Sequence, residues 1–417
     1  MPPAKNVSPS AESVDFRSPD FLRRHILHTM SFYDSRALDA SGGFFHFFKD
    51  DGTVYDAQTR HLVSSTRFVF NYAAAARRFG NVQWRNAARH GLRFLRDVHR
   101  DAATGGYAWQ LRWHNGRKQV LDSANHCYGL AFVLLAHSHA ALAGITEARA
   151  GIAETFDLME NRFWEPLQSL YADEARPDWS LAPYRGQNAN MHACEAMLAA
   201  FEATLDRRYL DRAEAIADAV TRRLAAHADG LIWEHYRVDQ QGEWSPDWDY
   251  NRHDKSNIFR PWGYQPGHLT EWAKLLLILE RKRAGNWLLP RARELFAAGT
   301  EHAWDAEHRG LFYGFAPDEE QPGRFVVCDR DKYFWVQAES LAAAALLGLR
   351  TGDEHYWEWY DRLWAYAWRH FVDHRHGAWY RILAHDNKKV SDEKSPAGKT
   401  DYHTMGACHE VLTALSL

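Results

Sequence analysis

Cysteine is scarce in this sequence of 417 residues, and long apolar runs are absent. The four cysteines, Cys127, Cys194, Cys328 and Cys408, are far apart, and none belongs to a Cys-x-x-Cys pair. This distribution argues against a disulfide framework and against a cysteine zinc site. No uninterrupted apolar stretch reaches the roughly 18 residues of a membrane-spanning helix, and the mean hydropathy is −0.53. We therefore expect a soluble globular protein in a reducing compartment.

Charge of one sign is not in excess. The chain has 50 basic and 54 acidic residues, a net charge of −4, without long single-sign runs. This balance does not favour binding to nucleic acid or to an anionic membrane. Residues 1–18 are polar and lack the apolar segment of a secretion signal, so they predict a flexible lead-in to a cytoplasmic protein. We find no linker within residues 19–417 and expect a single domain there.

Two kinds of motif are also missing. No Gly-x-Gly-x-x-Gly follows a strand-like segment, and PAGKT at 396–400 lacks the upstream glycine of a phosphate-binding loop. The strained Gly-x-Ser-x-Gly turn of serine hydrolases is absent as well. The sequence therefore predicts neither a nucleotide cofactor nor serine-based hydrolysis, and we expect no cofactor.

Aromatic residues, in contrast, are abundant, and a pattern repeats. The chain has 18 Trp, 18 Tyr and 22 Phe, which is typical either of sugar-binding clefts or of large hydrophobic packing. A hairpin-like segment, often glycine followed by aromatic residues, recurs six times at intervals of 60 to 80 residues, near Gly43, Gly106, Leu170, Gly230, Gly310 and Gly377. Such a repeat indicates one structural unit per period.

Between the hairpins, apolar residues follow helical spacing. About twelve helices are predicted, over 19–37, 62–80, 83–99, 123–143, 146–163, 187–205, 207–227, 264–283, 286–303, 333–351, 353–372 and 401–416. The connection from each even helix to the next is short, whereas each odd-to-even connection is long and holds a hairpin. This alternation predicts an all-α toroid, an (α/α)6 barrel with even helices inside. All long loops and all inner-helix N-termini then lie on one face, which is the candidate site.

The first turns of the even helices carry reactive side chains. His192 and Glu195, like His268 and Glu271, have the i, i+3 spacing that places a carboxylate beside an imidazole and lets it orient the ring. Three histidines at equivalent ring positions favour a functional role over isolated surface pairs. The candidates at these helix starts are Arg67, Asn188, His192, Glu195, His268, Glu271, Trp335, Gln337, Glu339 and His403.

A metal site is the competing interpretation, because His and Glu side chains from facing helices can build one. The order here is His-x-x-Glu rather than Glu-x-x-His, and no His-Glu-x-x-His cluster occurs. We therefore expect no metal.

Five segments in order, STRFVF, GQNANMHACEA, PGHLTEW, KYFWVQAES and DYHT, resemble the N-acylglucosamine 2-epimerase superfamily. The resemblance covers nearly the whole chain past about residue 20 and is strongest to the mannose isomerase branch. It implies an (α/α)6 barrel that acts on the reducing end of free sugars, with Arg67, His192, His268 and His403 around the sugar. The segment FRPWG, which holds Arg260, resembles a substrate-contact segment of the family.

Moving a carbonyl between C1 and C2 requires removal of a weakly acidic C–H proton and stabilisation of an oxyanion. A neutral imidazole with a pKa near ~6.5 suits proton removal. We expect His403 and His268 to be the acid/base pair, with His403 moving the C–H proton and Glu271 orienting His268. Arg67 and His192 would bind the enediolate oxygens, with Glu195 orienting His192. Loop tryptophans such as Trp262 offer flat faces to a sugar.

The predicted function is therefore a cofactor-free isomerase of D-mannose and D-fructose, with D-lyxose and D-xylulose as a further pair, through a cis-enediol. A mannose/glucose or N-acylglucosamine 2-epimerase and a sulfoquinovose isomerase are the near alternatives. An (α/α)6 glycoside hydrolase would need two opposed carboxylates, and a purely sugar-binding toroid would have no use for three inward histidines. The expected partner is a free monosaccharide, and the sequence leaves a monomer and a homodimer open.

Overall fold

The computed structural model describes residues 14–254, 257 and 259–417. In this part of the chain twelve α-helices form, so the predicted helix number and the all-α class are confirmed. The helices are α1 (Pro19–Tyr33), α2 (Leu62–Phe79), α3 (Val82–Phe94), α4 (Cys127–Leu142), α5 (Ala148–Arg162), α6 (Gln187–Thr204), α7 (Arg207–Asp218), α8 (Pro266–Lys282), α9 (Leu288–Glu301), α10 (Phe334–Thr351), α11 (Glu354–His370) and α12 (Tyr402–Ala414).

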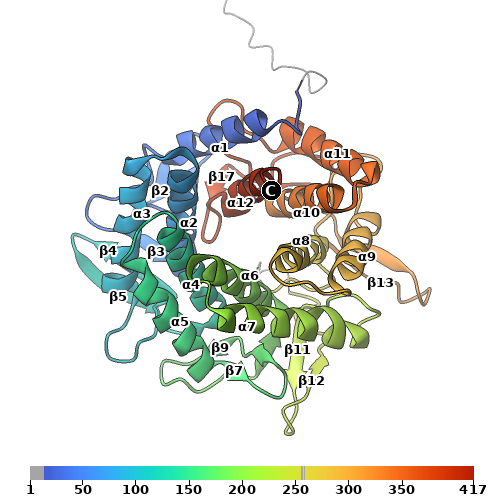
Figure 1. The fold of residues 1–417 in the computed structure, drawn as a ribbon, viewed down its shortest axis with the longest axis horizontal. Coiled ribbons are helices and arrows are strands. Elements are labelled where there is room, and N and C mark those ends of the chain that lie inside the picture. Colours follow the sequence, from blue (N-terminus) through green and yellow to red (C-terminus); the bar gives the residue numbers. More distant parts are fainter. Residues whose placement is uncertain (1–13, 255–256, 258) are drawn as a thin grey trace, which may run out of the picture.

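The helices form two concentric layers (Figure 1). Each even helix contacts the next, and α12 contacts α2, so the inner layer closes into a ring. Every even helix also packs on an outer helix: α2 on α3, α4 on α5, α6 on α7, α8 on α9, α10 on α11 and α12 on α1. The inner helices therefore have neighbours on both sides.

The two layers differ in sequence as their burial requires. The inner helix α4 reads CYGLAFVLLAHSHAAL and is apolar around most of its circumference. Outer helices such as α7, RRYLDRAEAIAD, bury one stripe and expose charged residues on the other face. The short connection between α2 and α3 shows how one helix ends and the next begins. Gly80 ends α2 with a φ of 69°, which suits glycine. The side chain of the next residue, Asn81, caps α3.

Short strands occupy the long loops. They are β1 (Phe47–Lys49), β2 (Val54–Asp56), β3 (Thr59–His61), β4 (Gln110–His114), β5 (Arg117–Asp122), β6 (Asn125–His126), β7 (Trp164–Glu165), β8 (Leu170–Tyr171), β9 (Glu174–Ala175), β10 (Tyr184–Gly186), β11 (His235–Val238), β12 (Trp244–Pro246), β13 (Gly314–Pro317), β14 (Phe325–Asp329), β15 (Lys332–Tyr333), β16 (Ile382–Leu383) and β17 (Glu393–Ser395). Because β6 pairs with β9, α4 begins at Cys127 rather than at the predicted residue 123.

The strands also join neighbouring loops, which local hairpin patterns do not predict. Antiparallel pairs β3–β4, β6–β9, β10–β11, β15–β16 and β17–β1 each connect one long loop to the next. The bridge between Tyr264 and Phe315 supplies the remaining link. The loops therefore form a closed collar at the end of the ring where the inner helices begin, and we call this end the N-end. The opposite end is the C-end.

Most of the predicted lead-in, residues 1–18, lies outside the described residues. Of its last part, Phe16 is buried and stacks on Trp364, with ring centroids 5.8 Å apart. Arg17 pairs with Asp361 on α11. None of the helices in the described part combines the length and apolarity needed to span a bilayer.

Candidate active site

The first turns of the inner helices converge on a pocket of about 90 Å³, the N-end pocket. An adjoining pocket of about 220 Å³, the rim pocket, shares Tyr128, Asn188 and Phe259 with it. Side chains from all six inner helices or the loops before them contribute. The N-end pocket is lined by Arg67, Tyr128, Asn188, His192, Phe259, Pro261, His268, Tyr313, Tyr333, Phe334, Trp335, Arg381, Ala397, Gly398, Lys399 and His403.

Three histidines of the N-end pocket share one arrangement. Nδ1 of His403 lies 2.7 Å from Oε1 of Glu339 on α10. Nδ1 of His192 lies 3.1 Å from Oε2 of Glu195 on the same helix. An ionised carboxylate accepts a hydrogen bond from Nδ1–H, which leaves the lone pair on Nε2. These two rings are thus held in the form that can accept a proton from a ligand.

His268 has the same arrangement, but its partner differs from the predicted one. Its Nδ1 lies 2.9 Å from Oε1 of Glu234, a residue of the loop before β11. Gln187 donates to the other oxygen of Glu234 at 2.9 Å. The i, i+3 prediction for Glu271 is wrong, because a carboxylate from the long loop before α8 pairs with the ring instead. The only signal for Glu234 in the sequence is an acidic residue inside the apolar segment IWEHY.

The electrostatic surroundings keep His403 and His192 neutral near pH 7. Burial, with smaller contributions from nearby cations such as Arg67, lowers the pKa of His403 well below its usual value. Burial likewise lowers the pKa of His192 to about 4, although Glu195 opposes the shift. Both rings are therefore available as bases rather than as imidazolium ions.

Arg67 supplies a buried positive charge to the pocket. It donates to the carbonyl of Gly398 at 2.6 Å and to the hydroxyl of Tyr128 at 3.1 Å. Its guanidinium stacks on Phe132, 4.4 Å from the ring centroid. Among the described residues its buried Nε has no hydrogen-bond partner. This fixed cation is placed to stabilise an oxyanion.

Glu271 is fully buried beneath the histidines. Its oxygens have no hydrogen-bond partner in the described part of the chain, and the closest cation is the Lys274 ammonium at 3.7 Å. Burial, and then repulsion from Glu339, raises the pKa of Glu271 well above its usual value. This raised pKa disfavours the ionised form, whereas a carboxyl that orients an imidazole through Nδ1–H must be ionised.

The same carboxylates and histidines have the composition of a metal site. Potential ligand atoms of Glu271, Glu339 and His403 lie within 4.8 Å of one another, and so do those of His192, Glu195 and Glu271. The Lys274 ammonium already lies among these carboxylates, 2.5 Å from Glu339. These potential metal ligands therefore already have a cation, the Lys274 ammonium, among them.

The remaining predicted contacts divide into two groups. Asn188 and Trp335 line the N-end pocket, and the Trp335 ring lies 4.9 Å from His268 and 5.7 Å from His403 between centroids. Arg260 lines the rim pocket, where it pairs with Glu174 at 3.0 Å.

Gln337 and Trp262, however, line neither of these pockets. Gln337 instead accepts from and donates to the backbone of Leu311, as Asn190 does for Tyr171. Trp262 donates to the carbonyl of Trp248. The predicted substrate contact of Gln337 is corrected, because its buried amide holds a loop of the collar. The predicted contact of Trp262 stays a prediction. Pocket residues that the sequence reasoning missed are Tyr128, Phe259, Tyr313, Tyr333, Arg381 and Lys399.

Comparison with known proteins places this site in a family. Residues 43–407 match the model of the N-acylglucosamine 2-epimerase (GlcNAc 2-epimerase) family. A D-mannose isomerase from Marinomonas mediterranea is 52% identical over 404 residues, which cover 96% of this chain and 99% of that protein. A crystal structure of a D-mannose isomerase, also 52% identical, superposes with a TM-score of 0.91 over 96% of this chain and 99% of that one.

The fold is shared more widely. Cellobiose 2-epimerase from Bacillus thermoamylovorans, 18% identical, superposes with a TM-score of 0.81 over 95% of this chain and all of that one. The chain belongs to the N-acylglucosamine 2-epimerase family. The expectation of a carbohydrate isomerase from this family is confirmed.

Proposed function

We propose that this chain is a cofactor-independent aldose–ketose isomerase that interconverts D-mannose and D-fructose through a cis-enediol, with D-lyxose and D-xylulose as a further pair. The observation that carries the proposal is the set of three buried histidines at one pocket, each with a glutamate on Nδ1. Full-length identity of 52% to a D-mannose isomerase supports the choice of sugar.

In the proposed reaction His403 is the base for the C–H bond. Nε2 of His403 takes the proton from C2 of the open-chain aldose, and the electron pair forms the C1–C2 double bond of an enediolate. The negative charge on O1 faces Arg67, and the unprotonated Nε2 of His192 accepts a hydrogen bond from the O2 hydroxyl. Return of the proton from His403 to C1, with transfer of the O2 proton to O1, gives the ketose.

His268 acts on the oxygen atoms. Ring opening needs a proton taken from the anomeric hydroxyl and one given to the ring oxygen, and an imidazole oriented by Glu234 can mediate both transfers. Trp335 lies between His268 and His403 and offers an aromatic face to the sugar. Arg260 in the rim pocket contacts hydroxyls farther from the reacting carbons.

We assign no metal to the reaction, because Lys274 supplies a fixed cation among Glu195, Glu271 and Glu339. We propose that residues 19–417 form one catalytic (α/α)6 barrel. The protein acts on free monosaccharides as a monomer or homodimer. Its four free cysteines suit the reducing cytoplasm.

The test is to incubate EDTA-treated protein with D-mannose in D2O and to follow products and label by NMR. Fructose with deuterium at the reacting carbons is expected. Glucose as the main product would replace the isomerase with a 2-epimerase, and dependence on added metal would overturn the metal-free mechanism. No conversion of mannose would overturn the substrate assignment, and sulfoquinovose and N-acylglucosamine would be assayed next.

A further inference from the structure

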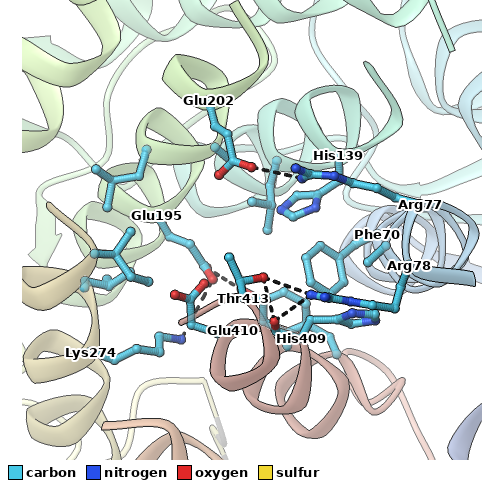
Figure 2. Close-up of a pocket in the computed structure, with 18 of the residues that line it drawn as sticks. Phe70, Arg77, Arg78, His139, Glu195, Glu202, Lys274, His409, Glu410 and Thr413 are labelled. Carbon is cyan, nitrogen blue, oxygen red and sulfur yellow. Dashed lines mark hydrogen bonds and ion pairs between the residues drawn. The ribbon is translucent and has the colours of Figure 1, made fainter. Parts of the chain in front are cut away.

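The inner ring is hollow at both ends. At the C-end a cavity of about 420 Å³ is lined by the last turns of the inner helices (Figure 2). Glu195, Lys274, Glu339 and Tyr402 line its inner end. These side chains lie directly beneath the histidines of the N-end pocket. The C-end cavity therefore reaches the catalytic machinery from the side away from the sugar.

Lys274 joins three carboxyl groups at this inner end. Its Nζ lies 2.5 Å from Oε2 of Glu339, 3.7 Å from Oε1 of Glu271 and 4.0 Å from Oε1 of Glu195. Figure 2 shows Lys274 and Glu195 entering the cavity from neighbouring helices. Burial opposes the charge on Lys274, but Glu339 and then the other two carboxyls raise its pKa. The side chain is therefore an ammonium ion although it is 5% exposed.

Two of these carboxylates are the partners of two catalytic histidines. Glu339 bonds Lys274 through one oxygen and His403 through the other. Glu195 faces Lys274 with Oε1 and His192 with Oε2. Burial opposes ionisation of Glu195, yet the Lys274 ammonium holds the pKa of this carboxyl below its usual value. One cation thus acts on both histidines through a single intervening residue each.

We propose that Lys274 is a positioning residue, which keeps Glu339 and Glu195 ionised so that His403 and His192 carry their proton on Nδ1 and present an unprotonated Nε2 to the sugar. The inference rests on the proposed function of these histidines. Without the ammonium, two buried carboxylates and Glu271 share one site with no cation, and a protonated Glu339 can donate to Nδ1. That reverses the tautomer of His403 and blocks its use as a base.

His268 provides an internal control. Its partner Glu234 bonds Gln187 rather than Lys274. Removing the ammonium should therefore change the tautomers of His403 and His192 and leave that of His268 as it is. A lysine that only stabilises the fold would not distinguish between these histidines.

The experiment compares Lys274→Ala with Lys282→Ala. Lys282 is on the same helix and lines the same cavity, but it pairs with Glu202 at 3.6 Å. We expect Lys274→Ala to lower kcat about 100-fold with KM changed by less than about twofold, by analogy with the loss of other groups that fix a catalytic histidine. Methylammonium, which can enter the vacated space from the C-end, should restore kcat without competing with the sugar. Lys282→Ala should keep near-wild-type kcat, and methylammonium should not change it.

Conversion of D-mannose by the wild type is measured first and decides the proposed function on its own. The effect of Lys274→Ala is then the ratio of its kcat to the wild-type kcat, measured with the sugar that the wild type converts. A folded Lys274→Ala with unchanged kcat overturns the inference, and so does a loss of activity that the amine does not restore.

If Lys274→Ala does not fold, Lys274→Met, which fills a similar volume, is examined by NMR of the ¹⁵N-labelled histidines. We expect Nδ1-protonated His192, His268 and His403 in the wild type. Only His268 should keep that tautomer in Lys274→Met, and unchanged tautomers at all three positions overturn the inference.

Discussion

The two ends of the ring carry the same residue type in different surroundings. At the N-end three histidines each have a glutamate on Nδ1. At the C-end His139 of α4 and His409 of α12 also lie in inner helices, but neither makes a hydrogen bond to a carboxylate in the described part of the chain. Burial lowers their pKa values to about 4 and about 3. A buried histidine is therefore a candidate catalyst here only where a carboxylate fixes its tautomer.

The cations differ in the same way. At the C-end Arg78 donates to the carbonyl of His409 and to Thr413, and Arg77 pairs with Glu202 (Figure 2). Basic side chains in the last turn of a helix stabilise its carbonyl end. At the N-end Arg67 instead faces an open pocket. The comparison teaches that Arg77 and Arg78 serve the helix ends, whereas Arg67 also faces a pocket that can hold a ligand.

The strongest test of this contrast replaces two histidines of α12 in separate variants, His403 at the N-end and His409 at the C-end. His403→Ala should lower kcat about 10³- to 10⁴-fold and stop exchange of the substrate C2 proton, because the base is lost. Turnover and deuterium incorporation in D2O are measured by NMR. His409→Ala, on the same helix, should keep turnover within a few-fold. Retained C2 exchange in folded His403→Ala would remove the assigned role, and equal losses in both variants would erase the contrast between the ends.

A smaller effect is expected when the carboxylate rather than the histidine is changed. Glu234→Gln should lower kcat about 100-fold with little change in KM, because an amide can donate to Nδ1 and favour the wrong tautomer of His268. Steady-state kinetics on the sugar give both constants. Glu243→Gln, in the loop that follows β11, is the control and should behave as the wild type. An inactive Glu243→Gln, or an unaffected Glu234→Gln, would contradict the assigned role of Glu234 in fixing the tautomer of His268.

The smallest expected effect concerns stability. The folded-state pKa of Glu271 is raised, so the stability linked to its protonation is fully present below the unfolded value of about 4.3 and is lost as the pH rises through the folded pKa. The Glu271→Gln variant has no titratable group at this position, so its stability does not fall with pH for this reason. Its midpoint of thermal unfolding should exceed that of the wild type by about 2 °C at pH 8 and approach it at pH 4.5.

Glu202 gives the opposite sign and serves as the control. Burial opposes the shift, but Arg77 and Lys282 lower its pKa, so its stabilisation is present above the unfolded pKa and is lost as the pH falls. Glu202→Gln should therefore be less stable than the wild type at neutral pH. Parallel curves of unfolding midpoint against pH for Glu271→Gln and the wild type would contradict the raised pKa of Glu271.

Much of the site was predictable because it lies at helix starts. The alternation of short and long connections places Arg67, His192, His268 and His403 at one end of a ring, and the structure brings them into one pocket. The pair His192–Glu195 follows from i, i+3 spacing alone. Gln337 shows the limit of this reasoning, because a first-turn position equally suits a side chain that holds the preceding loop.

The sequence by itself determined the helix pairs, the repeat and the residue types at the inner-helix starts, since these depend on local periodicity and on the order of short and long loops. Tertiary structure decided which carboxylate meets which histidine. Glu234 reaches His268 from the loop before α8, across 34 residues, and Glu339 reaches His403 across 64 residues. Such pairings depend on how neighbouring helices and loops pack, so local spacing cannot encode them, and the buried charge of Lys274 becomes meaningful only once its three partners surround it.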